Sequence, residues 1–128
     1  MSGKRLARLT VDQLLQRFIE IGEKRHFAKI TNDSRRYNRY VDQTWAVYTE
    51  LASRGDEARD KILPLMDHRN PGVRLAAAGV TMYFAPELGK AGFERLVRDR
   101  NPGNEIESIT ADLYLSMHAR GELIHKPE

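Results

Sequence analysis

The 128-residue chain contains no cysteine, which excludes disulfide bonds, zinc sites built on thiolates and a cysteine nucleophile. Long apolar runs are missing as well, because no segment approaches the roughly 18 consecutive apolar residues of a membrane helix. The basic start of the chain is not followed by the apolar stretch of a signal peptide. We therefore expect a cytoplasmic protein that is neither anchored in a membrane nor exported by that route.

What is present is the composition of an ordinary globular protein, with 41% hydrophobic and 30% charged residues. A chain of this length hides about two-thirds of its unfolded surface around one core. We expect a single domain over residues 1–128, in which residues 1–9 form a flexible start and residues 122–128 form a C-terminal tail.

Two long helices are predicted in the first half of the chain. Thr10 followed by Gln13 is the pattern of a capping box, which predicts a helix over residues 11–26. A second helix is predicted from Asp33 to the turn at Gly55, where glycine suits the left-handed end of a helix. Both segments carry apolar stripes at helical spacing: Val11, Leu14, Leu15, Phe18 and Ile19, then Tyr37, Tyr40, Val41, Thr44, Trp45, Tyr48, Leu51 and Ala52.

Four shorter helices are predicted in the second half, from residue 56, over residues 71–85, from residue 86 and after residue 103. Pro64 should shorten or kink the first of them, because proline lacks the backbone donor. Asn70 can cap the second, with Pro71 in its first position. The fold class is therefore all-α, with about six helices in three antiparallel pairs. Residues expected on the core side include Tyr83, Leu88, Ile109 and Leu113.

A short motif recurs in this half: Arg69-Asn70-Pro71-Gly72 returns thirty-one residues later as Arg100-Asn101-Pro102-Gly103. That period is typical of helix-turn-helix repeats. The segment around the first copy resembles the HEAT-repeat signature, in which an aliphatic helix and an Asp-containing turn precede Val-Arg and paired alanines. It reads Ile62-Leu63-Pro64-Leu65-Met66-Asp67-His68, then Asn70-Pro71, then Val73-Arg74-Leu75-Ala76-Ala77.

A larger part of the chain, from about Leu14 to Gly121, is similar to a small bacterial family of unknown function with an α-α superhelix. The resemblance implies a HEAT-like superhelix and a bacterial source, and it brings no activity with it. The HEAT-repeat resemblance, by contrast, implies a structural role in the turn for Asp67, Asn70, Pro71 and Arg74, in which Arg74 pairs with an acid of a turn, Asp67 or Asp99. The similarity to the bacterial family is carried by Asn38-Arg39, Ala52-Ser53-Arg54-Gly55 and Ala58-Arg59.

No catalytic, metal or cofactor signature is found, so we expect no enzyme, metal site or cofactor. The histidines lack metal-ligand spacing. His68 beside Asp67 could transfer protons, but a turn cap is the favoured interpretation. The carboxylate pairs at helix starts are expected to complement helix dipoles, since catalytic pairs require burial. The four histidines are His26, His68, His118 and His125, and the carboxylate pairs are Asp56/Asp60 and Glu105/Asp112.

The functional hypothesis is a non-enzymatic protein–protein interaction module, such as an inhibitor or immunity-type partner of another bacterial protein, acting as a monomer or weak dimer. The alternative is nucleic-acid binding through the basic N-terminal part, where residues 1–42 hold ten Lys/Arg against five Asp/Glu. Arg35, Arg36 and Arg39, interleaved with Tyr37 and Tyr40, are the candidate partner-binding residues, although a solvated helix face remains open for them.

Overall fold

The computed structural model describes residues 3–122, and all of its regular elements are helices. The all-α prediction is therefore confirmed for this part of the chain. None of the described helices is long and apolar enough to cross a membrane. The elements are α1 (Gly3–Ala7), α2 (Val11–Ile30), α3 (Ser34–Ser53), α4 (Asp56–Asp60), the 3-10 helix η1 (Leu63–Asp67), α5 (Pro71–Phe84), α6 (Pro86–Arg98) and α7 (Glu105–Ala119).

The start of the chain differs from the flexible segment predicted for residues 1–9. Residues 3–7 form α1, and the side chain of Leu6 is only 2% exposed. Arg54 donates hydrogen bonds to the carbonyls of Leu6 and Ala7, both at 3.2 Å, so α1 is held against the end of α3. The predicted C-terminal tail falls almost wholly outside the described residues.

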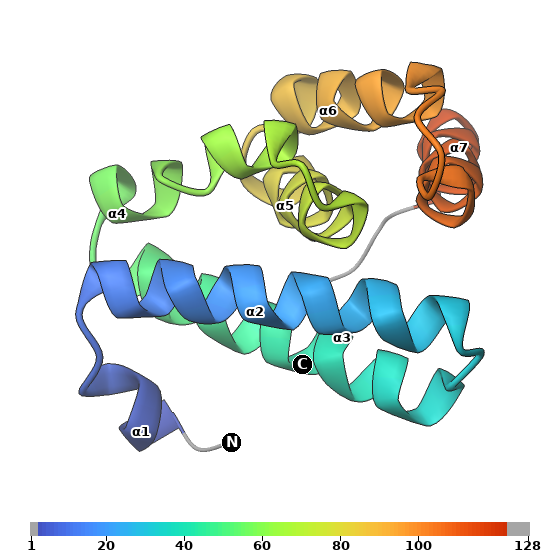
Figure 1. Cartoon of the computed structure of the whole chain (residues 1–128). Helices are drawn as coiled ribbons and strands as arrows, with labels where there is room; N and C mark the ends of the chain where they lie inside the picture. Colours follow the sequence, from blue (N-terminus) through green and yellow to red (C-terminus); the bar gives the residue numbers. More distant parts are fainter. Residues whose placement is uncertain (1–2, 123–128) are drawn as a thin grey trace.

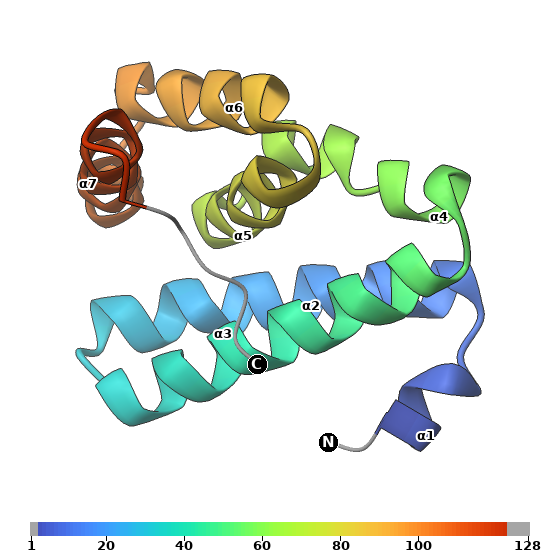
Figure 2. The same cartoon turned by 180° about the vertical axis from the view of Figure 1, so that it is seen from behind.

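Helices α2 and α3 form a long antiparallel pair that lies side by side in both views (Figures 1 and 2). The capping box at the start of α2 is present: Gln13 N donates to Thr10 Oγ1 at 3.1 Å, and Thr10 N donates to Gln13 Oε1 at 2.8 Å. However, α2 continues past residue 26 to Ile30, because Ala28 extends its buried stripe. The chain then turns at Asn32, and Asp33 caps α3 by accepting from the backbone N–H of Arg36.

Helix α5 lies across α2 and also packs against η1 and α6, while α7 packs on α6 (Figures 1 and 2). Asn70 caps α5, accepting from Gly72 N at 2.8 Å and from Val73 N at 3.2 Å. This cap brings the backbones of α2 and α5 into contact: a Cβ on Gly72 would lie 2.2 Å from the carbonyl oxygen of Gly22. Only glycine fits at such a crossing.

The second copy of the repeated turn does not act like the first. Helix α7 begins at Glu105, after the turn, and its N-cap residue Asn104 makes no side-chain cap hydrogen bond. Gly103 adopts a positive φ of 94° instead of entering a helix. Pro102 therefore does not take the first helical position that Pro71 takes in α5.

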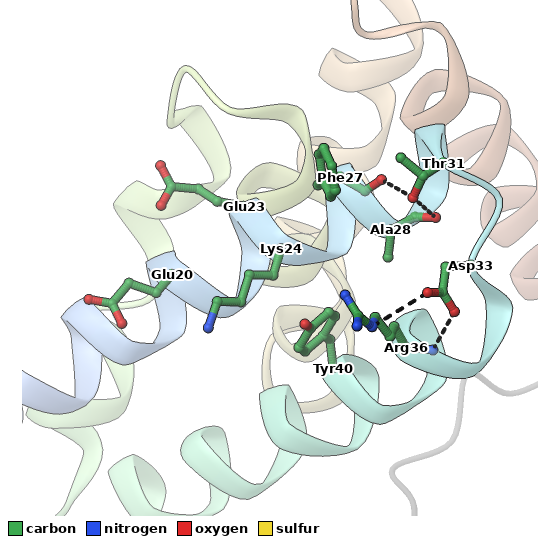
Figure 3. Close-up of a pocket in the computed structure, with 9 residues that line it drawn as sticks. All are labelled: Glu20, Glu23, Lys24, Phe27, Ala28, Thr31, Asp33, Arg36 and Tyr40. Atoms are coloured by element: carbon green, nitrogen blue, oxygen red, sulfur yellow. Dashed lines mark hydrogen bonds and ion pairs between the residues drawn. The ribbon is translucent and has the colours of Figure 1, made fainter.

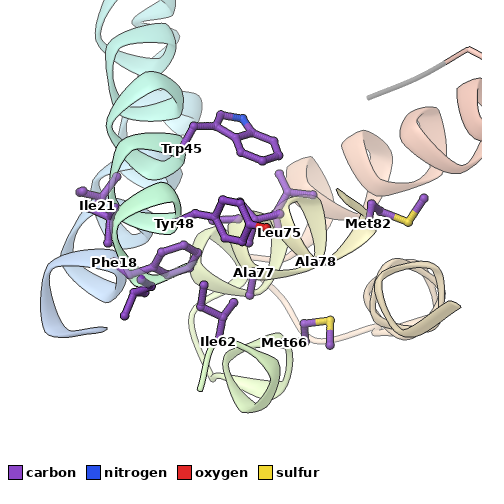
Figure 4. Close-up of a cluster of buried hydrophobic side chains, with 14 of the residues drawn as sticks. Phe18, Ile21, Trp45, Tyr48, Ile62, Met66, Leu75, Ala77, Ala78 and Met82 are labelled. Carbon is purple, nitrogen blue, oxygen red and sulfur yellow. The ribbon is translucent and has the colours of Figure 1, made fainter. Parts of the chain in front are cut away.

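The core lies between the α2–α3 pair and the layer formed by η1, α5 and α6 (Figure 4). Tyr48 stacks on Phe84 with ring centroids 5.7 Å apart. Four residues expected on the core side are at least half exposed: Tyr83, Leu88, Ile109 and Leu113. Helix α7 is rotated relative to the expectation, because its buried residues are Glu107 and Ala111, with Tyr114 partly buried on the same side.

Candidate functional site

The residues in and beside the first repeated turn join helices or hold the turn itself. Arg74 pairs with Asp99 rather than with Asp67, and both side chains of this pair are at most 15% exposed. Asp67 instead accepts a hydrogen bond from Arg95 at 3.0 Å. His68 Nδ1 accepts from the backbone N–H of Asn70 at 3.0 Å, so this histidine serves the turn.

Asp99 is the centre of the polar contacts between this turn and the next. It accepts from Asn101 N at 2.9 Å, from Arg74 and from Asn104 Nδ2 at 2.8 Å. The hydrogen bond from the Asn101 backbone, followed by that from Arg74, lowers the pKa of the Asp99 carboxyl below its ordinary value. The ionised form of Asp99 is therefore the one that the fold stabilises.

The three candidate partner-binding arginines are all exposed in the first turns of α3. The Nε atom of Arg36 lies 3.5 Å from Oδ2 of Asp33, and the Arg36 side chain is 64% exposed. Of the two tyrosines interleaved with them, Tyr37 packs under Lys29, whose Nζ lies 4.4 Å from the ring centroid, whereas Tyr40 lines the groove described below. Of the three arginines, only Arg36 lines this groove.

That groove runs between the C-terminal half of α2 and the start of α3 and has a volume of about 330 Å³ (Figure 3). An aromatic side chain, Phe27, stands at its wall and is 62% exposed; nearby on α2, Ile30 is 53% exposed. Charges of both signs surround this apolar wall. We call this site the α2–α3 groove; its lining residues are Glu20, Glu23, Lys24, Phe27, Ala28, Thr31, Asp33, Arg36 and Tyr40.

Sequence reasoning missed Phe27 because the predicted helix ended one residue before it. It also missed a contact between α2 and α7, in which His26 Nδ1 lies 3.0 Å from Glu107 Oε2. Glu107 is only 1% exposed, and its other oxygen, Oε1, has no hydrogen-bond partner. Since 81 residues separate the two partners, no local pattern could have paired them. Across residues 3–122, no three His, Cys, Asp or Glu side chains converge in the manner of a metal site.

Together these features define a protein that is all-helical over residues 3–122, with turn residues that serve the fold and an α2–α3 groove that combines an exposed aromatic residue with mixed charge. Residues 12–105 match a family described as a domain of unknown function (DUF2019), and the chain belongs to this family. The predicted membership in a family of unknown function is thereby confirmed.

The chain is also similar to a solved bacterial structure, the crystal structure of the protein RPA1889 from Rhodopseudomonas palustris CGA009. The two are 25% identical with a TM-score of 0.78, over 96% of this chain and 98% of that one. Comparison with curated proteins finds no match. The similarity supports the fold and carries no activity over to this chain.

Proposed function

We propose that this protein is a non-enzymatic protein-interaction module that binds a partner protein through the α2–α3 groove. The observation that carries the proposal is the exposure of Phe27, at 62%, in the wall of a hollow lined by charged side chains. Exposed aromatic residues with polar surroundings are typical of the anchor points of protein interfaces. Ile30 extends the apolar surface along the same helix.

The charges around the groove favour a protein segment over a nucleic acid. Three carboxylates, of Glu20, Glu23 and Asp33, line the groove together with two cations, Lys24 and Arg36. A phosphate backbone would be repelled by the carboxylates, whereas a peptide can place both signs of charge opposite them. We infer that the partner inserts an apolar side chain beside Phe27 and flanks it with charged residues.

In this proposal the helices form a HEAT-like α-α superhelix of three antiparallel pairs, which presents an extended surface to its partner. The protein acts in the cytoplasm as an inhibitor or immunity-type partner of another bacterial protein. It is a monomer or weak dimer when free, and it uses no cofactor.

The test compares tagged wild-type protein with a Phe27→Asp variant in affinity capture from the host lysate after nuclease treatment. Ile109→Asp is the matched control, because Ile109 is 71% exposed on α7 and lies outside the groove. We expect a stoichiometric protein to be retained by the wild type and the control and lost by Phe27→Asp. Equal retention by all three would exclude the groove as the interface.

The second candidate function is nucleic-acid binding by Arg35, Arg36 and Arg39, supported by the exposure of all three at one end of α3. Each phosphate neutralised on duplex DNA adds about 0.9 to the slope of log affinity against log salt. A triple change to alanine should therefore reduce that slope by roughly 2–3. An unchanged slope in a fluorescence-polarisation titration would reject this surface.

A further inference from the structure

A second cavity, of about 210 Å³, lies among α2, α3, α5 and α7 and is separate from the α2–α3 groove. Most of its lining is apolar, and no Asp or Glu is among the lining residues. One side chain that lines it, Arg25, is cationic. The lining residues are Arg25, Val41, Thr44, Trp45, Leu75, Ala76, Gly79, Val80, Tyr114 and Met117.

Arg25 is buried, and no residue within 3–122 gives it a charged partner. Only 6% of the residue is exposed, and its two hydrogen bonds go to neutral hydroxyls: NH1 donates to Thr44 Oγ1 and NH2 donates to Tyr37 Oη, both at 3.3 Å. Its Nε–H has no acceptor. Among the described residues, no carboxylate forms an ion pair with this guanidinium. A buried cation in this state is costly, and an anion beside it would relieve the cost.

The neighbours of Arg25 cannot supply that anion. The hydroxyl of Thr44 is neutral, and it donates a hydrogen bond to the carbonyl oxygen of Tyr40 at 2.8 Å while it accepts one from Arg25. Burial raises the pKa of Tyr114 above its ordinary value, and its neighbour Tyr37, with which it forms a hydrogen bond, raises it further, so its hydroxyl stays protonated and supplies no negative charge. The cavity therefore holds a positive charge and an unpaired N–H of Arg25 that the described part of the chain leaves incompletely matched.

We propose that this cavity binds a small organic carboxylate, whose anionic end pairs with Arg25 and whose apolar body packs against Trp45, Leu75 and Met117. A carboxylate fits better than a phosphate, because a single cation and an apolar lining suit a monoanion with a hydrocarbon body. The planar guanidinium has five N–H donors, and the two protein hydrogen bonds leave several of them for the ligand. This inference is independent of the partner-binding role proposed for the groove.

Trp45 makes the proposal directly measurable, since it is the only tryptophan of the chain and lines the cavity. Figure 4 shows its indole ring projecting from α3 on the side of α5. We would titrate the full chain with cyclohexanecarboxylate and follow tryptophan fluorescence. Cyclohexanecarboxamide, which has the same shape without the charge, is the matched ligand control. We expect a saturable change with the carboxylate and at least about tenfold weaker binding of the amide.

Two variants locate the ligand. Arg25→Met should abolish the preference for the carboxylate over the amide. Gly79→Leu should block the cavity while leaving Arg25 in place, because a Cβ on Gly79 meets nothing within 4 Å and the residue lines the cavity. If Arg25→Met fails to fold by circular dichroism, Gly79→Leu and the amide still decide the question.

Three results would overturn the proposal: no saturable fluorescence change up to about 10 mM carboxylate, equal binding of the amide, or binding that persists unchanged in Gly79→Leu. A saturable response to inorganic phosphate alone would also overturn it, since the ligand class would then be wrong. Loss of binding in Gly79→Leu with retained folding, together with selectivity for the carboxylate, would establish the site.

Discussion

The contact between α2 and α5 gives a prediction that two chemically identical substitutions at helical glycines will have opposite effects on stability. Gly22, inside α2, faces α5, and a Cβ there would lie 2.7 Å from the Cα of Val73 and 2.8 Å from its Cγ2. Gly79, inside α5, has no atom within 4 Å of such a Cβ. Gly22→Ala and Gly79→Ala therefore bring the same intrinsic gain in helix propensity. They differ only in the atoms that the new methyl group meets.

The magnitudes follow from these two terms. Replacing glycine with alanine inside a helix stabilises by roughly 0.5–1 kcal/mol, so Gly79→Ala should raise the free energy of unfolding by about that amount. Overpacking costs typically 1–3 kcal/mol, and the upper part of that range applies at Gly22 because a backbone atom cannot rotate away. After the propensity gain, Gly22→Ala should lower the free energy of unfolding by about 1–2.5 kcal/mol.

Urea unfolding followed by circular dichroism at equilibrium measures both variants, with an unchanged m-value as the check that only stability has moved. We expect the two free energies of unfolding to differ by roughly 2–3 kcal/mol. If Gly22→Ala were as stable as Gly79→Ala, the backbones of α2 and α5 would have to be farther apart than the structure shows, and the reasoning would fail.

The buried polar residues give two further predictions. His26→Ala leaves the carboxylate of Glu107 buried without its partner and should lower the free energy of unfolding by about 1–3 kcal/mol, whereas the double variant with Glu107→Leu should recover part of this loss in urea unfolding. Because Asn101 and then Arg74 lower the folded-state pKa of Asp99, its contribution to stability is complete above the unfolded-state pKa and is lost as the pH falls through the folded-state value. Asp99→Asn should therefore reduce the melting temperature at pH 7, and its difference from the wild type should shrink at about pH 3.

Sequence reasoning worked where a helix boundary depends on residues close together in the chain. Thr10 with Gln13, and Asn70 at the second site, mark helix starts through hydrogen bonds that span at most three residues, and Pro71 fits the first position of α5 because its ring fixes a helical φ. Pro64 likewise marks the place where a short 3-10 helix replaces a continuous helix. Such signals depend on local geometry alone, which a sequence carries completely.

The same reasoning failed where the answer depends on packing between distant segments. The buried side of α7 includes Glu107, because His26 lies opposite it, and this rotation exposes Ile109 and Leu113. Apolar periodicity assigns Ile109 and Leu113 to the core, since it counts a glutamate as a surface residue. The helix α1 was missed for a similar reason, because Leu6 is buried by a helix that follows much later in the chain.

Two arginines show why the candidate ligand site also lay beyond the sequence. Arg74 and Arg25 are both well shielded from solvent, yet Arg74 meets the carboxylate of Asp99, whereas Arg25 meets the hydroxyls of Thr44 and Tyr37 and the ring of Tyr37, which are all uncharged. The burial of an arginine is explained when a carboxylate of the same protein neutralises its charge. No such carboxylate neutralises Arg25 among the described residues, and Arg25 lines a cavity with space for an anion. The contrast separates an arginine that joins helices from one that is available to a ligand, and only the folded arrangement of α2, α3 and α7 reveals it.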